Sequence, residues 1–259
     1  MEEITQGHLD DVVAQFEHLI AVGEEVIGSP LQNDRLVEVL ELSSAATRLW
    51  KQVLETARRR PAPLTFFDGT ILMAPIVVLR GTPECVTFYQ DTLAELTREE
   101  TPGAVPDEEV RLYWEGMPIW GRLRRLAEFF RENQTAVVAS TYCNSWVFDA
   151  FDPQRPLESM AHAYTQIFIN RGERTKVQAM LELMEKFQVD GVVFHDSKTC
   201  FNNSNNRFGL PRKLQETSPF ATVVIDGDLN DLRFLSEGQM LTKLETFIDQ
   251  LKARRHATV

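Results

Sequence analysis

Apolar residues in the first hundred positions recur three and four residues apart, which is the spacing of an amphipathic helix. The pattern predicts one helix over residues 8–27 and a second over residues 33–60, each followed by glycine or proline. A third helix is expected to begin at Thr82, where a capping hydroxyl, a proline and an acid follow one another. The first two helices can pair as an antiparallel hairpin, and residues 64–80 are expected to form a buried apolar connector.

The pattern changes after a proline-rich linker at residues 101–106, where short β-branched runs begin to alternate with helical segments. Such alternation predicts a parallel sheet with helices on both sides. The expected fold is α/β, with an N-terminal helical region over residues 1–105 and a doubly wound four-stranded parallel sheet over residues 106–259. The expected strands are residues 110–115, 135–140, 190–195 and 221–225.

Composition narrows the range of partners. The 259-residue chain has a formal net charge of −11 and no basic stripe with interleaved aromatics, so nucleic acid is not an expected partner. No apolar run approaches the ~18–20 residues that a membrane helix needs, and the acidic N-terminus has no signal-peptide pattern. We therefore expect a cytoplasmic protein whose three cysteines are free, metal-bound or catalytic rather than disulfide-paired.

Chemically reactive side chains follow several of the predicted strands. Parallel strands end at one edge of a sheet, so Glu115, Cys143, His195 and Cys200 are expected to lie at that edge. Thiolates are the usual ligands of iron–sulfur clusters, and two of the three cysteines are in this group. The alternative is that both cysteines are small, partly buried residues without a chemical role. His195 is expected either to donate a proton or to be an ordinary hydrogen-bonded histidine.

Other common chemistries have little support in the sequence. Glycine-rich nucleotide-binding loops and a Gly-x-Ser-x-Gly nucleophile elbow are absent, and no cysteine or histidine spacing is typical of zinc. Cys85 lies in the first turn of a predicted helix and is expected to be a packing residue. Three tryptophans can line an apolar pocket or simply pack in the core: Trp114, Trp120 and Trp146.

Four segments between residues 106 and 259 resemble the cluster-bearing subunits of 2-hydroxyacyl-CoA dehydratases and benzoyl-CoA reductases. They are Arg111–Trp120, Ala139–Cys143, His195–Cys200 and Asp228–Ser236. The first half also resembles the helical stretch that joins the two α/β domains of this family. The segments concerned are Asp34–Leu36, Leu49–Trp50, Pro61–Pro63 and Gly81–Glu84.

The resemblance implies a subunit that carries a [4Fe–4S] cluster beside an acyl-CoA pocket and works with a homologous cluster-bearing subunit. An ATP-dependent iron–sulfur activator would deliver single electrons to this cluster. The resemblance makes Cys143 and Cys200 candidate ligands, and it makes His195 a candidate either to hydrogen-bond the cluster or to donate a proton. The candidate residues of the pocket wall are Glu115, Trp120, Asn144, Lys198 and Asn202.

The loop His195–Cys200 and the segment Ala139–Tyr142 look more like the reductase branch, which implies one-electron reduction of an aromatic acyl-CoA in anaerobic aromatic degradation. The alternatives are a 2-hydroxyacyl-CoA dehydratase subunit and a non-catalytic scaffold subunit. Members of the family carry another α/β domain ahead of the helical stretch, and it supplies a further cluster cysteine. We therefore expect an incomplete ligand set here, in a fragment, in a chain paired with a separate polypeptide, or in a chain that has lost the cluster.

Overall fold

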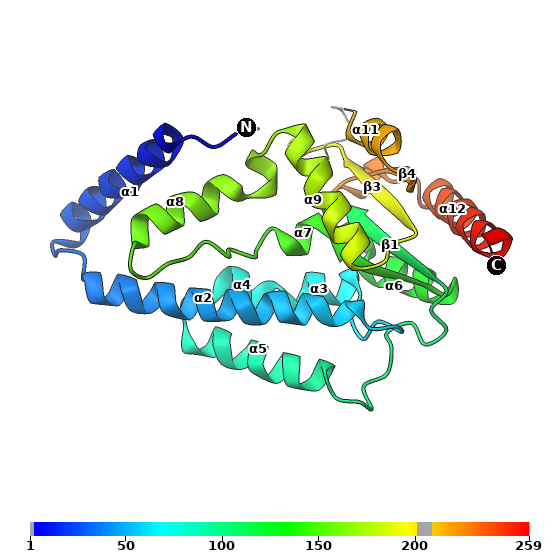
Figure 1. Ribbon diagram of the computed structural model, residues 1–259, viewed down its shortest axis with the longest axis horizontal. Helices are drawn as coiled ribbons and strands as arrows, with labels where there is room; N and C mark the ends of the chain where they lie inside the picture. The colour runs from blue at the N-terminus through cyan, green and yellow to red at the C-terminus, as the bar shows by residue number, and fades with distance from the viewer. Residues whose placement is uncertain (1–2, 201–208, 259) are drawn as a thin grey trace.

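A four-stranded parallel sheet organises the computed structural model, which describes residues 3–200 and 209–258 (Figure 1). The strands are β1 (Val110–Glu115), β2 (Thr135–Ser140), β3 (Gly191–Ser197) and β4 (Ala221–Gly227). Their order across the sheet is β2-β1-β3-β4, and every neighbouring pair is parallel. The predicted α/β fold is therefore confirmed. The last two strands run two residues further than predicted, so His195 lies within β3.

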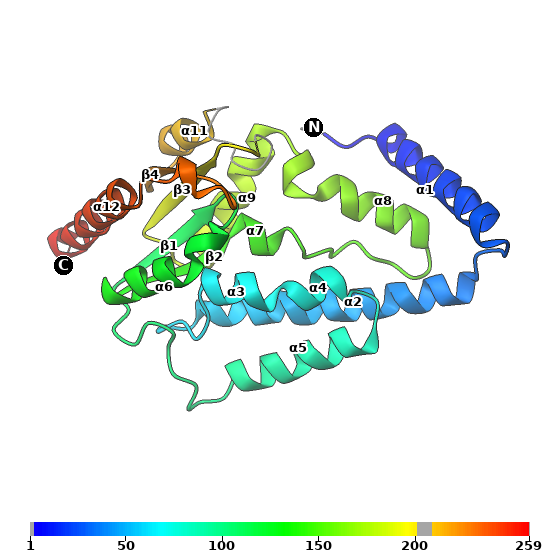
Figure 2. The ribbon, with the colours of Figure 1, turned by 180° about the vertical axis from the view of Figure 1, so that it is seen from behind.

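Helices cover both faces of the sheet, which is why the central strands are apolar on both sides. All six residues of β1 and of β2 are buried. One face carries α6 and α12 and the other carries α9 and α11 (Figures 1 and 2). These helices are α6 (Leu123–Glu132), α9 (Glu173–Lys186), α11 (Leu210–Thr217) and α12 (Glu237–Thr258).

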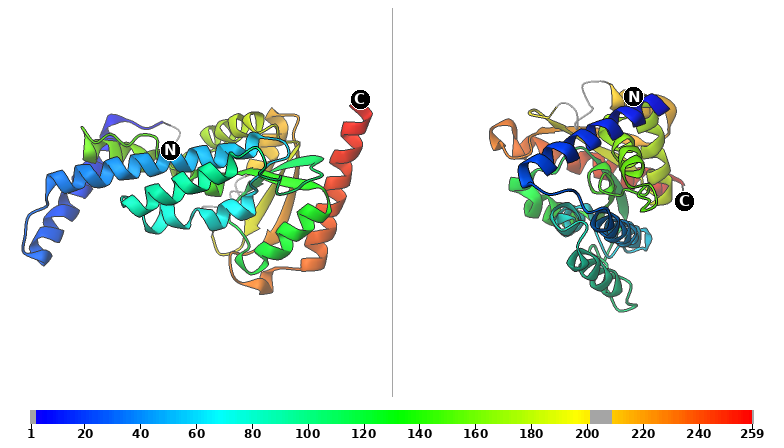
Figure 3. Two further views of the ribbon diagram at one scale, coloured as in Figure 1. Left: turned by 90° about the horizontal axis from the view of Figure 1, so that it is seen from below. Right: turned by 90° about the vertical axis from the view of Figure 1, so that its left-hand side faces the viewer.

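The N-terminal helices extend from one side of the sheet, and α12 lies at the other end of the molecule (Figure 3). The long helix α2 lies against α5, whereas α1 lies along α8 rather than pairing with α2 as a hairpin. The bounds are α1 (Gln6–Ile27), α2 (Asn33–Glu55), α5 (Pro83–Leu96) and α8 (Pro156–Gln166). The shorter elements are η1 (Thr56–Arg58), α3 (Phe66–Leu72), α4 (Ala74–Val78), η2 (Trp120–Arg122), α7 (Thr141–Asn144), η3 (Phe168–Asn170) and η5 (Leu232–Phe234). Throughout the described ranges, no helix has the length and apolar character that crossing a membrane requires.

The expected connector at residues 64–80 folds into α3 and α4 and joins the helical region to the sheet. The ring of Phe66 stacks on Trp114 of β1 at 5.2 Å, and Phe67 meets the same indole edge-on at 6.1 Å. One hydrophobic core runs from Ala46 in α2 to Leu251 in α12. A division into domains at residue 105 therefore stays a prediction.

A buried arginine joins the same two regions at the opposite edge of the sheet. Arg111 of β1 is fully buried and donates to Glu108 at 2.7 Å. Its guanidinium also donates to the carbonyls of Ala57 at 2.7 Å, Arg59 at 2.6 Å and Phe187 at 2.8 Å. The side chain thus satisfies carbonyls at the end of the α2–η1 helix and just after α9, which have no helical partner of their own.

Replacing Arg111 should therefore destabilise the whole chain. We expect Arg111→Met to lower the free energy of unfolding by about 3–5 kcal/mol, because it leaves Glu108 buried without its main cation. The matched control is Arg60→Met, because Arg60 contacts the same carboxylate at 3.1 Å from a side chain that is 38% exposed. Its loss should cost about 1 kcal/mol or less. Denaturant unfolding of the two variants measures both values, and equal losses would contradict the central role of Arg111.

Candidate functional site

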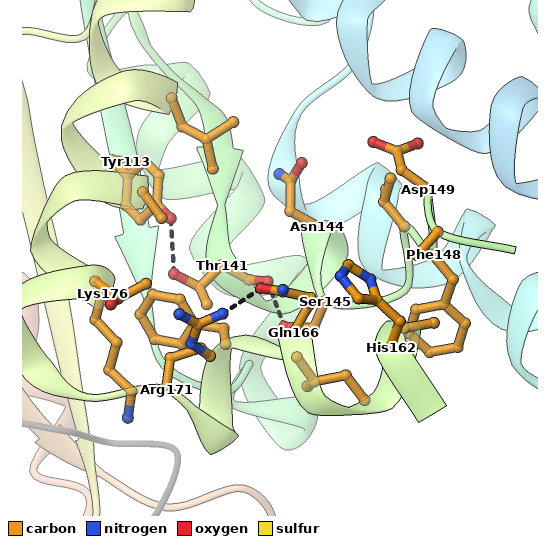
Figure 4. A pocket seen from close by; sticks show the side chains of 18 residues that line it. Tyr113, Thr141, Asn144, Ser145, Phe148, Asp149, His162, Gln166, Arg171 and Lys176 are labelled. Atoms are coloured by element: carbon orange, nitrogen blue, oxygen red, sulfur yellow. Dashed lines mark hydrogen bonds between the residues drawn. The ribbon is translucent and has the colours of Figure 1, made fainter. Parts of the chain in front are cut away.

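A cavity of about 530 Å³ opens at the carboxyl edge of the sheet, on the face that carries α9 (Figure 4). Its volume lies in the range of small-molecule sites. The wall comes from β1, α7, the segment after α7, α8, η3 and α9. The lining residues include Tyr113, Thr141, Asn144, Phe148, His162, Gln166, Ile167, Arg171 and Lys176.

A row of hydrogen bonds connects this cavity to a buried carboxylate. Tyr113 and Glu115 are two residues apart on β1, so their side chains point to the same face of the sheet. The short helix α7 places Thr141 between them. The Thr141 hydroxyl donates to Glu115, and the Tyr113 hydroxyl lies 2.7 Å from Thr141 Oγ1. Because Thr141 has one hydroxyl proton and donates it to Glu115, Tyr113 must be the donor to Thr141. The row can therefore pass a proton between the cavity and Glu115.

The ionisation of Tyr113 agrees with this direction of donation. Burial, followed by the nearby charge of Glu115, raises the pKa of Tyr113 well above its usual value. The phenol therefore keeps its proton at neutral pH and presents a neutral hydroxyl to the cavity.

The cavity also carries two cations, on the same side as Tyr113 in Figure 4. Figure 4 shows Arg171 and Lys176 at the left of the cavity and Phe148 and His162 at the right. Arg171 donates to Gln166, and the ammonium of Lys176 lies 5.3 Å from the ring centre of Phe168. Guanidinium and ammonium groups at one end suit an anionic group such as a phosphate.

The structure brings only some of the predicted pocket residues to this cavity. Asn144 lines it, and Glu115 reaches it through Thr141. Trp120 is 36% exposed in η2 and is absent from the wall. Lys198 is paired with Asp196 at 2.6 Å and Asp226 at 2.7 Å, also away from the wall. Asn202 lies outside the described residues.

His195 is at the predicted edge but on the other face of the sheet. Its ring lies 6.0 Å from that of Trp114, and its Nδ1 donates to the carbonyl of Met117 at 2.6 Å. The other ring nitrogen, Nε2, is buried without a hydrogen-bond partner. Burial lowers the pKa of His195, so the ring is neutral at pH 7. His195 does not line the cavity, and its assignment as a proton donor stays a prediction.

The two candidate cluster ligands have different surroundings. Cys143 is 2% exposed, and burial raises the pKa of its thiol to about 11. Its sulfur lies so close to Gly69 that an added Cβ would sit 3.4 Å away, and the void beside it measures about 10 Å³. Such a void holds about one water molecule and has no room for a four-iron cluster. Cys200 is partly exposed.

The described residues do not by themselves form a cluster site. In residues 3–200 and 209–258, no three histidine, cysteine, aspartate or glutamate side chains are grouped as a metal ion requires. The assignments of Cys143 and Cys200 as cluster ligands therefore stay predictions. The close packing around Cys143 does not favour its assignment as a ligand.

Comparison with known proteins identifies the family to which the sequence belongs. A family model described as 2-hydroxyglutaryl-CoA dehydratase, D-component, matches residues 3–251. The chain belongs to this family. Lactoyl-CoA dehydratase subunit alpha of Anaerotignum propionicum is 30% identical over 95% of this chain and 59% of its own length. A benzoyl-CoA reductase subunit of Thauera aromatica is 28% identical over 98% of this chain and 62% of its own length. The chain thus spans about three-fifths of these relatives.

The sequence-based reasoning missed most of the wall of the cavity. His162 and Gln166 are four residues apart on α8, a spacing that places two side chains on one helix face. That spacing was the one sequence signal that these two side chains could line the same wall. No local pattern indicated that this face of α8 would meet Tyr113 and Lys176, because their positions depend on how α8 and α9 pack.

A buried aspartate holds the segment that leads to Cys200. Asp228, 3% exposed, accepts hydrogen bonds from the Thr199 hydroxyl at 2.7 Å and the Thr199 amide at 2.9 Å. The amides of Asn230 at 3.3 Å and Asp231 at 3.2 Å donate to its other oxygen. Burial opposes its charge, but these hydrogen bonds outweigh burial and lower the pKa of Asp228 to about 2.

This network predicts a pH-dependent contribution to stability. We expect Asp228→Asn to lower the free energy of unfolding by roughly 1–3 kcal/mol at pH 7. The folded pKa lies below the ordinary value of 3.8, so the contribution is complete above about pH 4 and is lost as the pH falls toward 2. The difference between wild type and variant should therefore shrink over that interval. Denaturant unfolding at several pH values measures it. Asp249→Asn is the control, because Asp249 lies exposed on α12, away from this network, and its replacement should leave the stability unchanged across the same pH range.

Proposed function

We propose that this chain is the acyl-CoA-binding subunit of a [4Fe–4S]-dependent radical enzyme complex of the benzoyl-CoA reductase type. The observation that carries the proposal is the cavity at the sheet edge, with cations at one end and the Tyr113–Thr141–Glu115 row in its wall. Arg171 and Lys176 bind the phosphates of CoA, and the acyl group occupies the less charged part of the cavity. Both the names of the relatives and the family model support an acyl-CoA thioester as the ligand.

The proposed role of the row is proton transfer. Reduction of an acyl group by single electrons builds negative charge that a proton must neutralise. In the row as it stands the hydroxyl protons point toward Glu115, so outward transfer first requires Glu115 to take up a proton from solvent; Glu115 then donates to Thr141, Thr141 to Tyr113, and Tyr113 gives its own proton to the acyl group in the cavity. Asn144, anchored to the carbonyl of Ser140 at 2.8 Å, keeps the adjacent wall in place.

In the proposed complex an iron–sulfur cluster would supply the single electrons, and an ATP-dependent iron–sulfur activator would reduce that cluster. The surroundings of Cys143 support a packing role, so we propose that Cys200 is the ligand this chain contributes. The other thiolates then come from polypeptide outside the described residues or from a homologous subunit.

Dehydration of a 2-hydroxyacyl-CoA is the second candidate reaction. The relative with 30% identity is a lactoyl-CoA dehydratase subunit, which favours this branch. Anaerobic assays of the purified complex with benzoyl-CoA and with lactoyl-CoA distinguish the two reactions.

The ligand assignment predicts which cations matter. Arg171→Ala and Lys176→Ala should each lower the affinity for CoA about tenfold, because each removes a charge-assisted hydrogen bond of about 1.5 kcal/mol or more. Isothermal titration of the chain with CoA measures the dissociation constants. Arg212→Ala is the control, because Arg212 is an exposed arginine on α11 paired with Glu216. Its affinity should equal that of the wild type.

The iron assignment predicts that the two cysteines behave differently. After anaerobic purification with its partner subunits, Cys200→Ser should lose bound iron and sulfide, whereas Cys143→Ser should keep the wild-type content. Colorimetric iron and sulfide analysis with the absorbance near 400 nm provides the measurement. Iron loss in Cys143→Ser would restore Cys143 as a ligand. A colourless wild type that also binds no CoA thioester would favour the scaffold subunit.

A further inference from the structure

A second cavity, of about 340 Å³, lies directly behind one wall of the first. The two cavities share three lining residues, Ser145, Phe148 and Ile167. These side chains therefore form a partition between the first cavity and the second one. No function assigned above uses the second space.

The second cavity is lined almost entirely by aromatic and aliphatic groups. Its own lining residues are Val77, Arg80, Tyr142, Trp146, Tyr164 and Ile169. The one cation, Arg80, donates to the hydroxyl of Thr47 at 2.7 Å and to the carbonyl of Trp146 at 2.6 Å. Because the protein itself engages this guanidinium, the space offers apolar surface rather than an anion site. An apolar group gains most from such a space.

Phe148 is the part of the partition that is held most firmly. Its side chain is 6% exposed, and the guanidinium of Arg80 lies 4.4 Å from the ring centre. Tyr164 and Phe151 contact the same ring at centroid distances of 5.5 and 5.3 Å. A ring with a cation and two aromatic neighbours has few alternative orientations. The partition is therefore closed by an ordered side chain.

Phe148 also lies at the appropriate end of the first cavity. In Figure 4 it is on the side opposite Arg171 and Lys176, the residues proposed to bind the phosphates. A thioester bound with its phosphates at those cations directs its acyl group toward Phe148.

We propose that Phe148 determines acyl-chain length in this subunit, by closing the first cavity to short acyl groups and separating it from an apolar chamber that would accept longer ones. This inference rests on the proposed binding of a CoA thioester in the first cavity. Phe148 is thus a specificity-determining residue, and the chamber behind it would take the aliphatic or aromatic end of a longer acyl group.

The test is a chain-length series. Straight-chain acyl-CoAs from acetyl to decanoyl are titrated into wild type, Phe148→Ala and Ile167→Ala, the last of which thins the same partition from the α8 side. Wild-type affinity should stop rising, or fall, beyond a short acyl group. In Phe148→Ala each further methylene should add about a fourfold gain, the value for burying one methylene.

The matched control is Phe151→Ala, since Phe151 contacts the Phe148 ring but lines neither of the two cavities. It should retain the wild-type length limit. Thermal unfolding of each variant confirms that the variant is folded before titration.

Three results would contradict the proposed role of Phe148. A length profile in both partition variants that parallels the wild type would overturn the role of Phe148 while leaving CoA binding intact. A gain in Phe151→Ala equal to that in Phe148→Ala would also overturn it, because loosening of the aromatic cluster would then be the cause. A wild type that binds neither CoA nor any thioester would overturn the proposed function, and this inference with it.

Discussion

The fold depends on the burial of one guanidinium. Arg111 brings a positive charge into the core at the amino end of β1. This charge is tolerated because Glu108 neutralises it and four carbonyls, those of Ala57, Arg58, Arg59 and Phe187, accept the remaining N–H protons. Two of those carbonyls, from Ala57 and Arg59, end the long α2–η1 helix. The position of α2 along the sheet is therefore set by a charged contact at one end, and everything that α2 supports follows from it.

What α2 supports is the wall of the cavity at the other edge. The indole of Trp50 donates to the carbonyl of Cys143 at 3.1 Å, and Lys51 pairs with Asp149 at 2.5 Å. Thr47 accepts from Arg80, whose guanidinium also holds Trp146 and Phe148. The segment after β2 is polar and has little regular structure of its own, so these contacts fix its path. The helical region thus shapes the cavity rather than standing apart from the α/β part.

The local sequence predicted the strands because a run of β-branched residues between turn residues usually forms a buried parallel strand in an α/β chain. It also placed Glu115, Cys143 and His195 at one edge, since parallel strands end together. It did not distinguish the two faces of that edge. The face depends on side-chain alternation and on register, and β3 continues through His195 to Ser197. The part of the cavity wall that comes from α8 and α9 could not be predicted from local sequence patterns, because only tertiary packing brings those helices close to Tyr113.

The separation of the two faces constrains the chemistry at this edge. Glu115 reaches the cavity through hydroxyls on one face, whereas His195 on the other face donates to the carbonyl of Met117 in the turn after β1. Within that turn Gly116 has a φ of 101°, and a Cβ there would lie 2.7 Å from the His195 carbonyl oxygen. A side chain at position 116 would therefore push β1 from β3 and displace Glu115 with it. The histidine and the glycine fix the strand end that carries the carboxylate, so the position of Glu115 depends on His195 through geometry even though His195 does not line the cavity.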